Sequence, residues 1–475
     1  MSKISRRGFL KGAVGTAAGL STVNFLNPSL GQAQGGPANN LVFVNLSGGM
    51  DSLGAYPYIE GEIYQYLMEG VGAVTARRPL LSFYPPGHTP VDTDRNDVAL
   101  TSTVLTNSQN GLPHKLGLNP GFRNLLTTAN GGVDVGGNIK IIKGVGSLGY
   151  ENGSHEDMQQ YLAMLSPAFL AADQTGWTAR ASDIASLPSF AFWGVCSCGN
   201  LPYFNTHGIR PIVVNSFSSL EFTDRSGMTS IGASGGDDDN RYTRQLAHQL
   251  LGYPGSPTAP EARFNAGMQT LPPAKFIVDA IETTPLVGDY TTNPSGFKNN
   301  FKQIAQILKY KQTSPELMNR PSIIYATRGG FDTHDNQVYL YYPNFRNGAL
   351  QTHLRDVADT LAQFIKDLQA ANIWTSTTIV LMSEFGRTTR QNSDQDSAGS
   401  DHARAASVMI LGGSVNGGVV GNDPAVSQII NSNGITSTIA FETPIGAVLD
   451  WLGISGTAVL PTYNRTLGNA LGLFV

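Results

Sequence analysis

Six short apolar runs rich in β-branched residues recur along the chain, far apart from one another, and each ends in a Gly-rich or polar turn. Three of them read "NLVFVNLSGG", "PSIIYATRGG" and "TTIVLMSEFG", and the six begin near residues 40, 138, 210, 321, 377 and 406. Runs of this kind are typical of strands buried on both faces of a mainly parallel sheet. Since such a sheet needs a covering layer on each face, the pattern restricts the chain to an α/β fold.

Amphipathic helical patterns lie between these runs, the clearest at residues 350–371, "LQTHLRDVADTLAQFIKDLQAA". A helix of this length followed by another apolar run is typical of a crossover connection. The order of elements therefore predicts one large α/β domain over residues 40–475. Two segments interrupt the rhythm: a loop-rich excursion at 75–135 and a largely helical insertion at 218–320, which contains "TSIGASGGDDDN".

The N-terminus, "SRRGFLKGAVGTAAGLSTVNFL", pairs Arg6 with Arg7 ahead of a weakly apolar, Gly/Ala-rich run. This is typical of a twin-arginine signal peptide, here residues 1–33, with cleavage after Ala33. A membrane anchor or a buried helix is the alternative, but the run is short and rich in glycine. We expect the twin-arginine translocase to export the chain, already folded, to a periplasmic or extracellular (secreted) location, with no stable membrane span in the mature protein.

Charge and cysteine content exclude some classes of partner and leave others open. Removal of a leader that carries four basic residues takes the formal charge from −4 to −8, which argues against nucleic acid as the main partner. The two cysteines, Cys196 and Cys198, stand in "GVCSCGN". They are too few for a zinc site by themselves, and whether they form a disulfide stays open.

Polar side chains that can carry chemistry follow the apolar runs or directly precede the last of them. They are Asp51 and Ser52, Ser154 and His155, Asp332 and His334, Glu384, Arg387 and Asn392, and Asp401 and His402. In doubly wound sheets ligands bind where the parallel strands end. Carboxylates and imidazoles gathered from distant loops are the ligands that zinc, manganese, magnesium and calcium accept. The pattern predicts a metal site at one edge of the sheet.

Each of these residues also has a purely structural interpretation. Asp51 can be the N-cap of a helix, and Ser154 can cap "HEDMQQYL" with Asp157 completing a capping box. Asp332 and His334 can belong to a surface turn, and Glu384 can form an ion pair with Arg387 at the end of the sheet.

Several motifs, in order along nearly the whole chain, resemble those of domain-of-unknown-function family 1501, a family of exported bacterial proteins. They include "LSGGMDSLGAYPY", "GSHEDMQ", "GGFDTHDNQ", "GSDHARA" and "AVLDWLGI". That family is grouped with the alkaline-phosphatase-like superfamily, which includes sulfatases. The resemblance implies an alkaline-phosphatase-like three-layer sandwich, with a mainly parallel sheet, helices on both faces and a helical insertion.

The resemblance also implies roles for single residues. Asp51 matches the first metal ligand, Ser154 the nucleophile, Asp332 and His334 a loop pair of ligands, and His402 the last histidine. Glu384 stands where the aspartate of an Asp-His pair belongs, so we expect it to be a ligand as well. Phe385 stands where the histidine of that pair belongs, so the site lacks one expected imidazole and holds either a single metal, an altered pair of metals or none.

The activity implied is metal-dependent hydrolysis of phosphate or sulfate esters, with a small anionic ester as the substrate. Zinc or manganese comes first as the cofactor, with calcium or magnesium as alternatives. Ser154 is expected to attack, with Ser52 as the competing nucleophile, while Arg387 or Arg328 clamps the substrate oxygens.

Two other functions remain open. The chain can be a non-catalytic exported binding or surface protein that keeps the fold, which Phe385 favours. It can also hold a purely structural metal, for example calcium bound by Asp51, Asp332 and Glu384. His155, Asp401 and Asn392 are secondary site candidates.

Overall fold

The computed structural model of the chain describes residues 38–475 with gaps, the longest at 82–115 and 218–277. Shorter gaps fall at 59–60, 74, 79–80, 151, 166–174, 188–190, 197–201, 205–210, 215, 279, 343–344, 394–396 and 432–433. The predicted signal peptide, much of the 75–135 excursion and most of the 218–320 insertion lie outside the described residues. Cys196 is disulfide-bonded, and Cys198 lies outside the described residues.

Nine strands of the described chain form one central sheet, ordered β12-β2-β11-β8-β1-β5-β3-β4, with β13 paired to β2. Their bounds are β1 (Asn40–Leu46), β2 (Ile139–Gly146), β3 (Phe192–Val195), β4 (Ile212–Val214), β5 (Ser322–Arg328), β8 (Thr377–Met382), β11 (Ala406–Gly412), β12 (Gly418–Val420) and β13 (Ile439–Ala440). All six predicted runs are strands. The sequence pattern missed the other three strands of this sheet, β3, β12 and β13, which have four, three and two residues.

The pairing is parallel throughout this sheet except at β11. Strand β11 runs antiparallel to both of its neighbours, β8 and β2. Its first residue, Ala406, pairs with Val145 near the end of β2. The start of β11 therefore lies at the same edge of the sheet as the carboxyl ends of the parallel strands.

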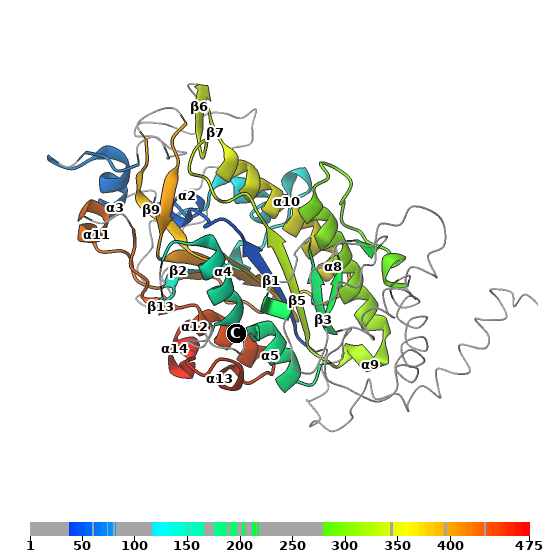
Figure 1. Cartoon of the computed structure of the whole chain (residues 1–475). Coiled ribbons are helices and arrows are strands. Elements are labelled where there is room, and N and C mark those ends of the chain that lie inside the picture. The colour runs from blue at the N-terminus through cyan, green and yellow to red at the C-terminus, as the bar shows by residue number, and fades with distance from the viewer. Residues whose placement is uncertain are drawn as a thin grey trace, which may run out of the picture.

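Helices cover both faces of the sheet, as Figure 1 shows. One face carries α10 (Ala349–Ala370) and α8 (Gly296–Thr313), and the other carries α4 (His155–Met164), α5 (Trp177–Ile184) and α12 (Glu442–Trp451). The predicted three-layer α/β sandwich is thereby confirmed. The predicted helix at 350–371 is α10, and α8, from the predicted insertion, packs into the core of the main domain.

The remaining elements are short and connect these layers. They are α2 (Ser52–Ala55), α3 (Glu62–Tyr64), η2 (Gln65–Glu69), η5 (Pro120–Leu125), η6 (Ala129–Gly131), η7 (Gly136–Asn138), η10 (Pro202–Phe204), α9 (Pro315–Met318), β6 (Tyr339–Tyr342), β7 (Phe345–Asn347), β9 (Gly386–Gln391), β10 (Ser400–Ala403), α11 (Val426–Asn431), α13 (Gly456–Val459) and α14 (Arg465–Ala470). Strands β9 and β10 pair with each other. Within the described part of the chain, no helix combines the length and the apolar character that crossing a membrane requires.

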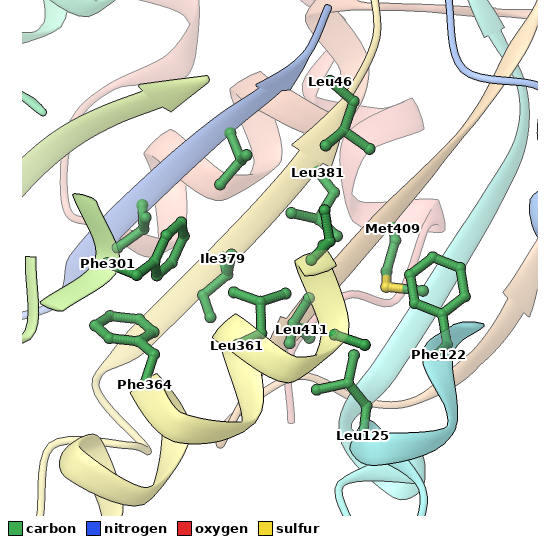
Figure 2. Close-up of a cluster of buried hydrophobic side chains, with 14 of the residues drawn as sticks. Leu46, Phe122, Leu125, Phe301, Leu361, Phe364, Ile379, Leu381, Met409 and Leu411 are labelled. Atoms are coloured by element: carbon green, nitrogen blue, oxygen red, sulfur yellow. The ribbon is translucent and has the colours of Figure 1, made fainter. Parts of the chain in front are cut away.

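Two separate apolar cores lie on opposite faces of the sheet because side chains alternate along each strand. Val42 and Val44 of β1 belong to the core under α10 and α8, whereas Leu41 and Phe43 belong to the core under α4, α5 and α12. Figure 2 shows the first core, where Leu361 of α10 approaches the strand residues Ile379 and Leu381. This packing makes the sheet a rigid base for the turns at its edge.

Candidate metal centre

The turns that carry the predicted site residues meet at the carboxyl edge of the parallel strands. Asp332 follows β5 and Glu384 follows β8, while His155 begins the helix after β2. His402, in β10, reaches the same edge because β11 runs antiparallel. Two glycines after β1 allow the turns to approach: a Cβ at Gly48 would lie 2.3 Å from the backbone nitrogen of Asp332, and one at Gly49 would lie 2.2 Å from the ring of Phe385. Both have positive φ, +119° and +73°, which glycine tolerates best.

Three imidazoles face the carboxylate of Asp332. Nε2 of His334 and Nε2 of His402 each lie 3.1 Å from Oδ1 of Asp332, and Nε2 of His155 lies 3.3 Å from Oδ2. One ligand atom from each of His155, Asp332 and His402 lies within 4.8 Å of the other two. Nε2 of His334 is 2.9 Å from Nε2 of His402, so this fourth donor borders the group. We call these four residues the His/Asp cluster.

The other ring nitrogen of each imidazole is held by an oxygen acceptor. Nδ1 of His155 donates to Oε1 of Glu384 at 2.9 Å, and Nδ1 of His334 donates to Oδ1 of Asp401 at 3.0 Å. Nδ1 of His402 donates to the carbonyl oxygen of Gly153 at 2.7 Å. These oxygens accept hydrogen bonds from Nδ1–H, so the proton of each neutral imidazole is on Nδ1. Nε2 therefore presents its lone pair to Asp332.

This arrangement of the cluster is more favourable with a bound cation than without one. Two lone pairs at 2.9 Å, on His334 and His402, repel each other unless a proton or a metal cation lies between them. The Nε2 atom of His155 is buried and has no hydrogen-bond partner. Ligand histidines in metal sites usually donate their second N–H to a carboxylate or carbonyl oxygen, as all three do here. The cluster therefore fits a divalent metal, with donors of the type that zinc and manganese accept.

Glu384 does not lie among the ligand atoms, where the sequence placed it. It is fully buried, and its Oε1 accepts from the backbone nitrogen of Gly48, from His155 and from Gln159. Phe385 stands where the sequence comparison called for a histidine. His155 brings an imidazole to the same place, because its ring packs against that of Phe385 with centroids 4.9 Å apart. The sequence indicated His155 only as a secondary candidate; its position at a helix start was the signal for it.

Asp51, expected as the first ligand, is also outside the cluster. It is fully buried, and its Oδ2 accepts from Arg78 at 2.6 Å and from Gln337 at 2.5 Å. Its Oδ1 accepts from the backbone nitrogen of Leu53, so it is the N-cap of α2. Asp51 is thus a helix N-cap, as the structural interpretation predicted. Its contacts do not support a calcium site formed by Asp51, Asp332 and Glu384.

The two arginines expected to clamp an anion are both engaged with the protein. Arg387 is buried and bonds Asp332 and four carbonyl oxygens, rather than Glu384. Arg328 donates to Asp356 at 2.8 Å, to the carbonyl of Gly329 and to Nδ1 of His353.

The two candidate nucleophiles differ in their surroundings. Ser154 is half-buried at the N-cap of α4, where its Oγ accepts a long bond of 3.4 Å from the backbone nitrogen of Asp157. Its sequence neighbours, Gly153 and His155, both contact the network around the cluster. Ser52 is buried, and its Oγ accepts from the backbone nitrogen of Ser407 at 2.6 Å. Ser154 is therefore the serine beside the cluster.

Asn392 supports the turn that holds His334. Its side-chain nitrogen donates to the carbonyl oxygen of His334 at 2.5 Å and to Asp401 at 3.3 Å. Asn392 thus contacts the backbone of one cluster residue and the carboxylate that orients its ring.

The electrostatics of the cluster keep its acids ionised. Burial alone would raise the pKa of Asp332, but hydrogen bonding, first from Arg387, outweighs it and holds that pKa well below its usual range. Burial likewise opposes ionisation of Glu384, yet hydrogen bonds, first from His155, lower its pKa. The hydrogen bond to Glu384 raises the pKa of His155 above its ordinary value. Asp332 and Glu384 are therefore anionic at neutral pH.

Solved structures that resemble the chain do so over most of its length but at low similarity. Ps i-CgsB is 9% identical with a TM-score of 0.37, and the match covers 92% of this chain and 77% of that one. The lipoteichoic acid synthase LtaP from Listeria monocytogenes is 10% identical with a TM-score of 0.30, covering 93% and 78%. The PsFucS1 sulfatase from Pseudoalteromonas sp. is 12% identical with a TM-score of 0.29, covering 90% and 70%.

No curated protein matches the chain. The model of one protein family, described as "Protein of unknown function (DUF1501)", matches residues 318–445. This stretch includes Asp332, His334, Glu384 and His402, and it runs from the end of α9 through β13 into α12. Residues 318–445 thus carry the DUF1501 family match that the motifs predicted.

Proposed function

We propose that the protein is a metal-dependent hydrolase of phosphate or sulfate esters. His155, Asp332 and His402 would hold the metal, with His334 as the neighbouring donor. The observation that carries the proposal is the convergence of three imidazole Nε2 atoms on one carboxylate, each ring oriented by an acceptor at Nδ1. Zinc and manganese suit such donors better than calcium or magnesium, which prefer oxygen ligands.

One side of the cluster is open to a substrate. The side chain of Asp332 is 45% exposed and that of His334 is 44% exposed, whereas Glu384 behind them is fully buried. A bound divalent metal would polarise an ester oxygen as a Lewis acid. The chain's own residues orient the donors: Glu384 and Asp401 hold the imidazoles of His155 and His334 so that each Nε2 faces Asp332 and the proposed metal position.

Ser154 is the residue that we assign as the nucleophile. It caps α4, a helix of ten residues, so the positive end of the helix dipole lies at its hydroxyl and favours an anionic ester there. Its Oγ–H is not needed for the cap, because Oγ acts as the acceptor in that bond. In the proposed step the Ser154 oxygen bonds to phosphorus or sulfur as the bond to the ester oxygen breaks, and the proton lost by Ser154 goes to the leaving oxygen. Water then breaks the bond to Ser154 Oγ, which releases the phosphate or sulfate and returns a proton to the serine.

We place this reaction outside the cytoplasmic membrane, after export by the twin-arginine translocase. The support for this is the sequence motif around Arg6 and Arg7. The substrate class, a small anionic ester, follows from the positive end of α4 and the open side of the cluster.

The test compares metal content with turnover of an aryl phosphate and an aryl sulfate. We expect His402→Ala to lose both bound metal and activity, and Ser154→Ala to keep the metal while losing more than about 100-fold in kcat. His353→Ala serves as the matched control, because this histidine contacts Arg328 and lies outside the cluster. Metal-loaded protein that turns over neither ester would contradict the proposed activity, and Ser154→Ala with wild-type turnover would remove Ser154 from it.

A purely structural metal site is the second candidate, and one observation favours it. His334 brings the number of nearby protein donors to four, and a tetrahedral zinc with four protein ligands has no position left for a substrate. His334→Ala separates the two functions. In a catalytic site it lowers or alters turnover, whereas in a structural site it changes only stability and metal affinity.

A further inference from the structure

Arg387 lies in a cage of oxygen atoms and has no solvent-exposed side-chain surface. Its Nε donates to the carbonyl oxygen of Gly49 at 2.7 Å, and its Nη1 donates to that of Ser400 at 2.8 Å. Its Nη2 donates to the carbonyl oxygens of Gly48 and Phe331 and to Oδ1 of Asp332. Nε and Nη1 each donate to one oxygen, and the two N–H groups of Nη2 face three oxygens. Because the side chain also has no exposed surface, Arg387 is held by the protein and is not placed to clamp a substrate.

The cage joins the turns that build the site. Gly48 and Gly49 belong to the turn after β1, Phe331 and Asp332 to the turn after β5, and Ser400 to β10. Backbone carbonyls with one carboxylate are also the ligands that hard metal cations take. The oxygen atoms at this position would suit a metal cation. The guanidinium of Arg387 occupies the position instead and supplies the positive charge.

The formal charges around the cluster leave room for one divalent ion. Asp332, Glu384 and Asp401 bring three negative charges, and Arg387 brings one positive charge. The two negative charges left over are balanced by a single divalent ion. A second such ion would leave excess positive charge beside a buried guanidinium, and buried charges without partners are strongly unfavourable.

Asp51, a buried carboxylate at this edge, is also paired with an arginine. Asp51 forms an ion pair with Arg78, and both side chains are almost fully buried. The carboxylates that follow β1 and β5, Asp51 and Asp332, thus each have an arginine partner. We propose that the site binds a single divalent ion and that Arg387 is an internal cation in place of a second one. This inference rests on the metal of the proposed function.

Wild-type protein tests the stoichiometry directly. Metal-free protein is titrated with zinc chloride and with manganese chloride by calorimetry, and the metal retained after gel filtration is measured by elemental analysis. We expect one equivalent per chain. Two equivalents held with similar affinity would overturn the single-ion inference and leave the hydrolase standing, whereas no bound metal would overturn both.

The role of Arg387 is tested by chemical rescue. We expect Arg387→Ala to weaken the zinc or manganese Kd by about 10-fold or more, because Asp332 loses the donor that fixes its carboxylate. Millimolar guanidinium chloride should restore the affinity, and equal sodium chloride should not. Arg465→Ala is the control for loss of one positive charge, since Arg465 pairs with Asp450 away from the cluster.

Two results would overturn this role for Arg387. One is an Arg387→Ala variant that binds the metal as tightly as wild type, with or without guanidinium. The other is an affinity that sodium chloride restores equally well. If Arg387→Ala does not fold, Arg387→Gln and the wild-type stoichiometry decide the question: a neutral glutamine variant that holds two equivalents supports the role, and one with wild-type stoichiometry and affinity overturns it.

Discussion

Each imidazole of the cluster is oriented by the acceptor behind it. The contact between Glu384 and His155 is the most buried of these, because Glu384 has no exposed surface and also accepts from Gly48 and Gln159. A carboxylate there makes Nδ1 the protonated nitrogen and increases the basicity of Nε2. In the proposed metal site Glu384 is accordingly a positioning residue.

Glu384→Gln tests this at the scale of one residue. The amide is a weaker acceptor than the carboxylate, so we expect metal affinity to fall by roughly 10- to 100-fold with the fold retained. The measurement is the Kd for zinc from a chelator competition. Glu442→Gln is the matched control, a buried glutamate whose partners are Tyr161 and Thr462. An unchanged Kd in Glu384→Gln, or an equal loss in the control, would contradict the positioning role.

The sequence could predict which turns would meet, but not how their side chains would pair. Asp332, His334 and His402 were placed by their positions after or before buried strands. Asp51 shared that position, yet its partner Arg78 lies in a segment without periodicity, so nothing in the pattern linked the two. The sequence indicated His155 as a secondary candidate, and its contact with the ring of Phe385 required the structure.

Strand β11 shows what an apolar run reveals about an element and what it does not. Its buried character predicted a strand, but a run reads the same whether the strand is parallel or antiparallel to its neighbours. The antiparallel direction brings His402, which precedes the strand, to the edge where the other site residues follow theirs. The strand's existence could be predicted from composition, and its direction required the tertiary pairing.

Helix α8 buries a lysine, and this makes stability depend on pH. Lys311 is 3% exposed and donates to Oδ1 of Asn40 at 2.6 Å. Burial lowers its pKa from the ordinary 10.5 to about 7. Between these two values the unfolded chain binds more protons than the folded one, so this group makes stability rise with pH, by on the order of 4 kcal/mol over the whole window.

Lys311→Met isolates this contribution. The variant should be more stable than wild type at pH 7, and the difference should shrink as the pH approaches 10, because the protonated fraction of Lys311 in the unfolded chain falls as the pH nears its ordinary pKa of 10.5. Urea midpoints at pH 7, 8.5 and 10 measure the effect. Lys302→Met is the control on the same helix, where the lysine is exposed. A difference between Lys311→Met and wild type that does not change with pH would refute the assignment.

At the scale of the whole molecule, the site depends on the sheet that carries it. The two apolar cores hold β1, β5, β8 and β11 in one layer, and the cluster is assembled from the turns at one edge of that layer. The repeated apolar runs were sufficient to predict such a layer with covered faces. The apolar runs could not predict the order of the strands, because local composition does not show which distant runs pair.

A metal that joins turns from β2, β5 and β10 should therefore stabilise the entire fold. The ligand residues 155, 332 and 402 are far apart in the sequence, so the unfolded chain cannot present them together. A metal bound only by the folded state adds RT ln(1 + [M]/Kd) to the free energy of unfolding, which is about 2.7 kcal/mol at a free metal concentration of 100 Kd.

Chelation by EDTA should lower the Tm of wild-type protein, and zinc or manganese should restore it. His402→Ala should melt at the same temperature with or without the chelator, while His353→Ala should keep the wild-type response. If neither EDTA nor added metal changed the wild-type Tm, these turns would meet without binding a common metal ion.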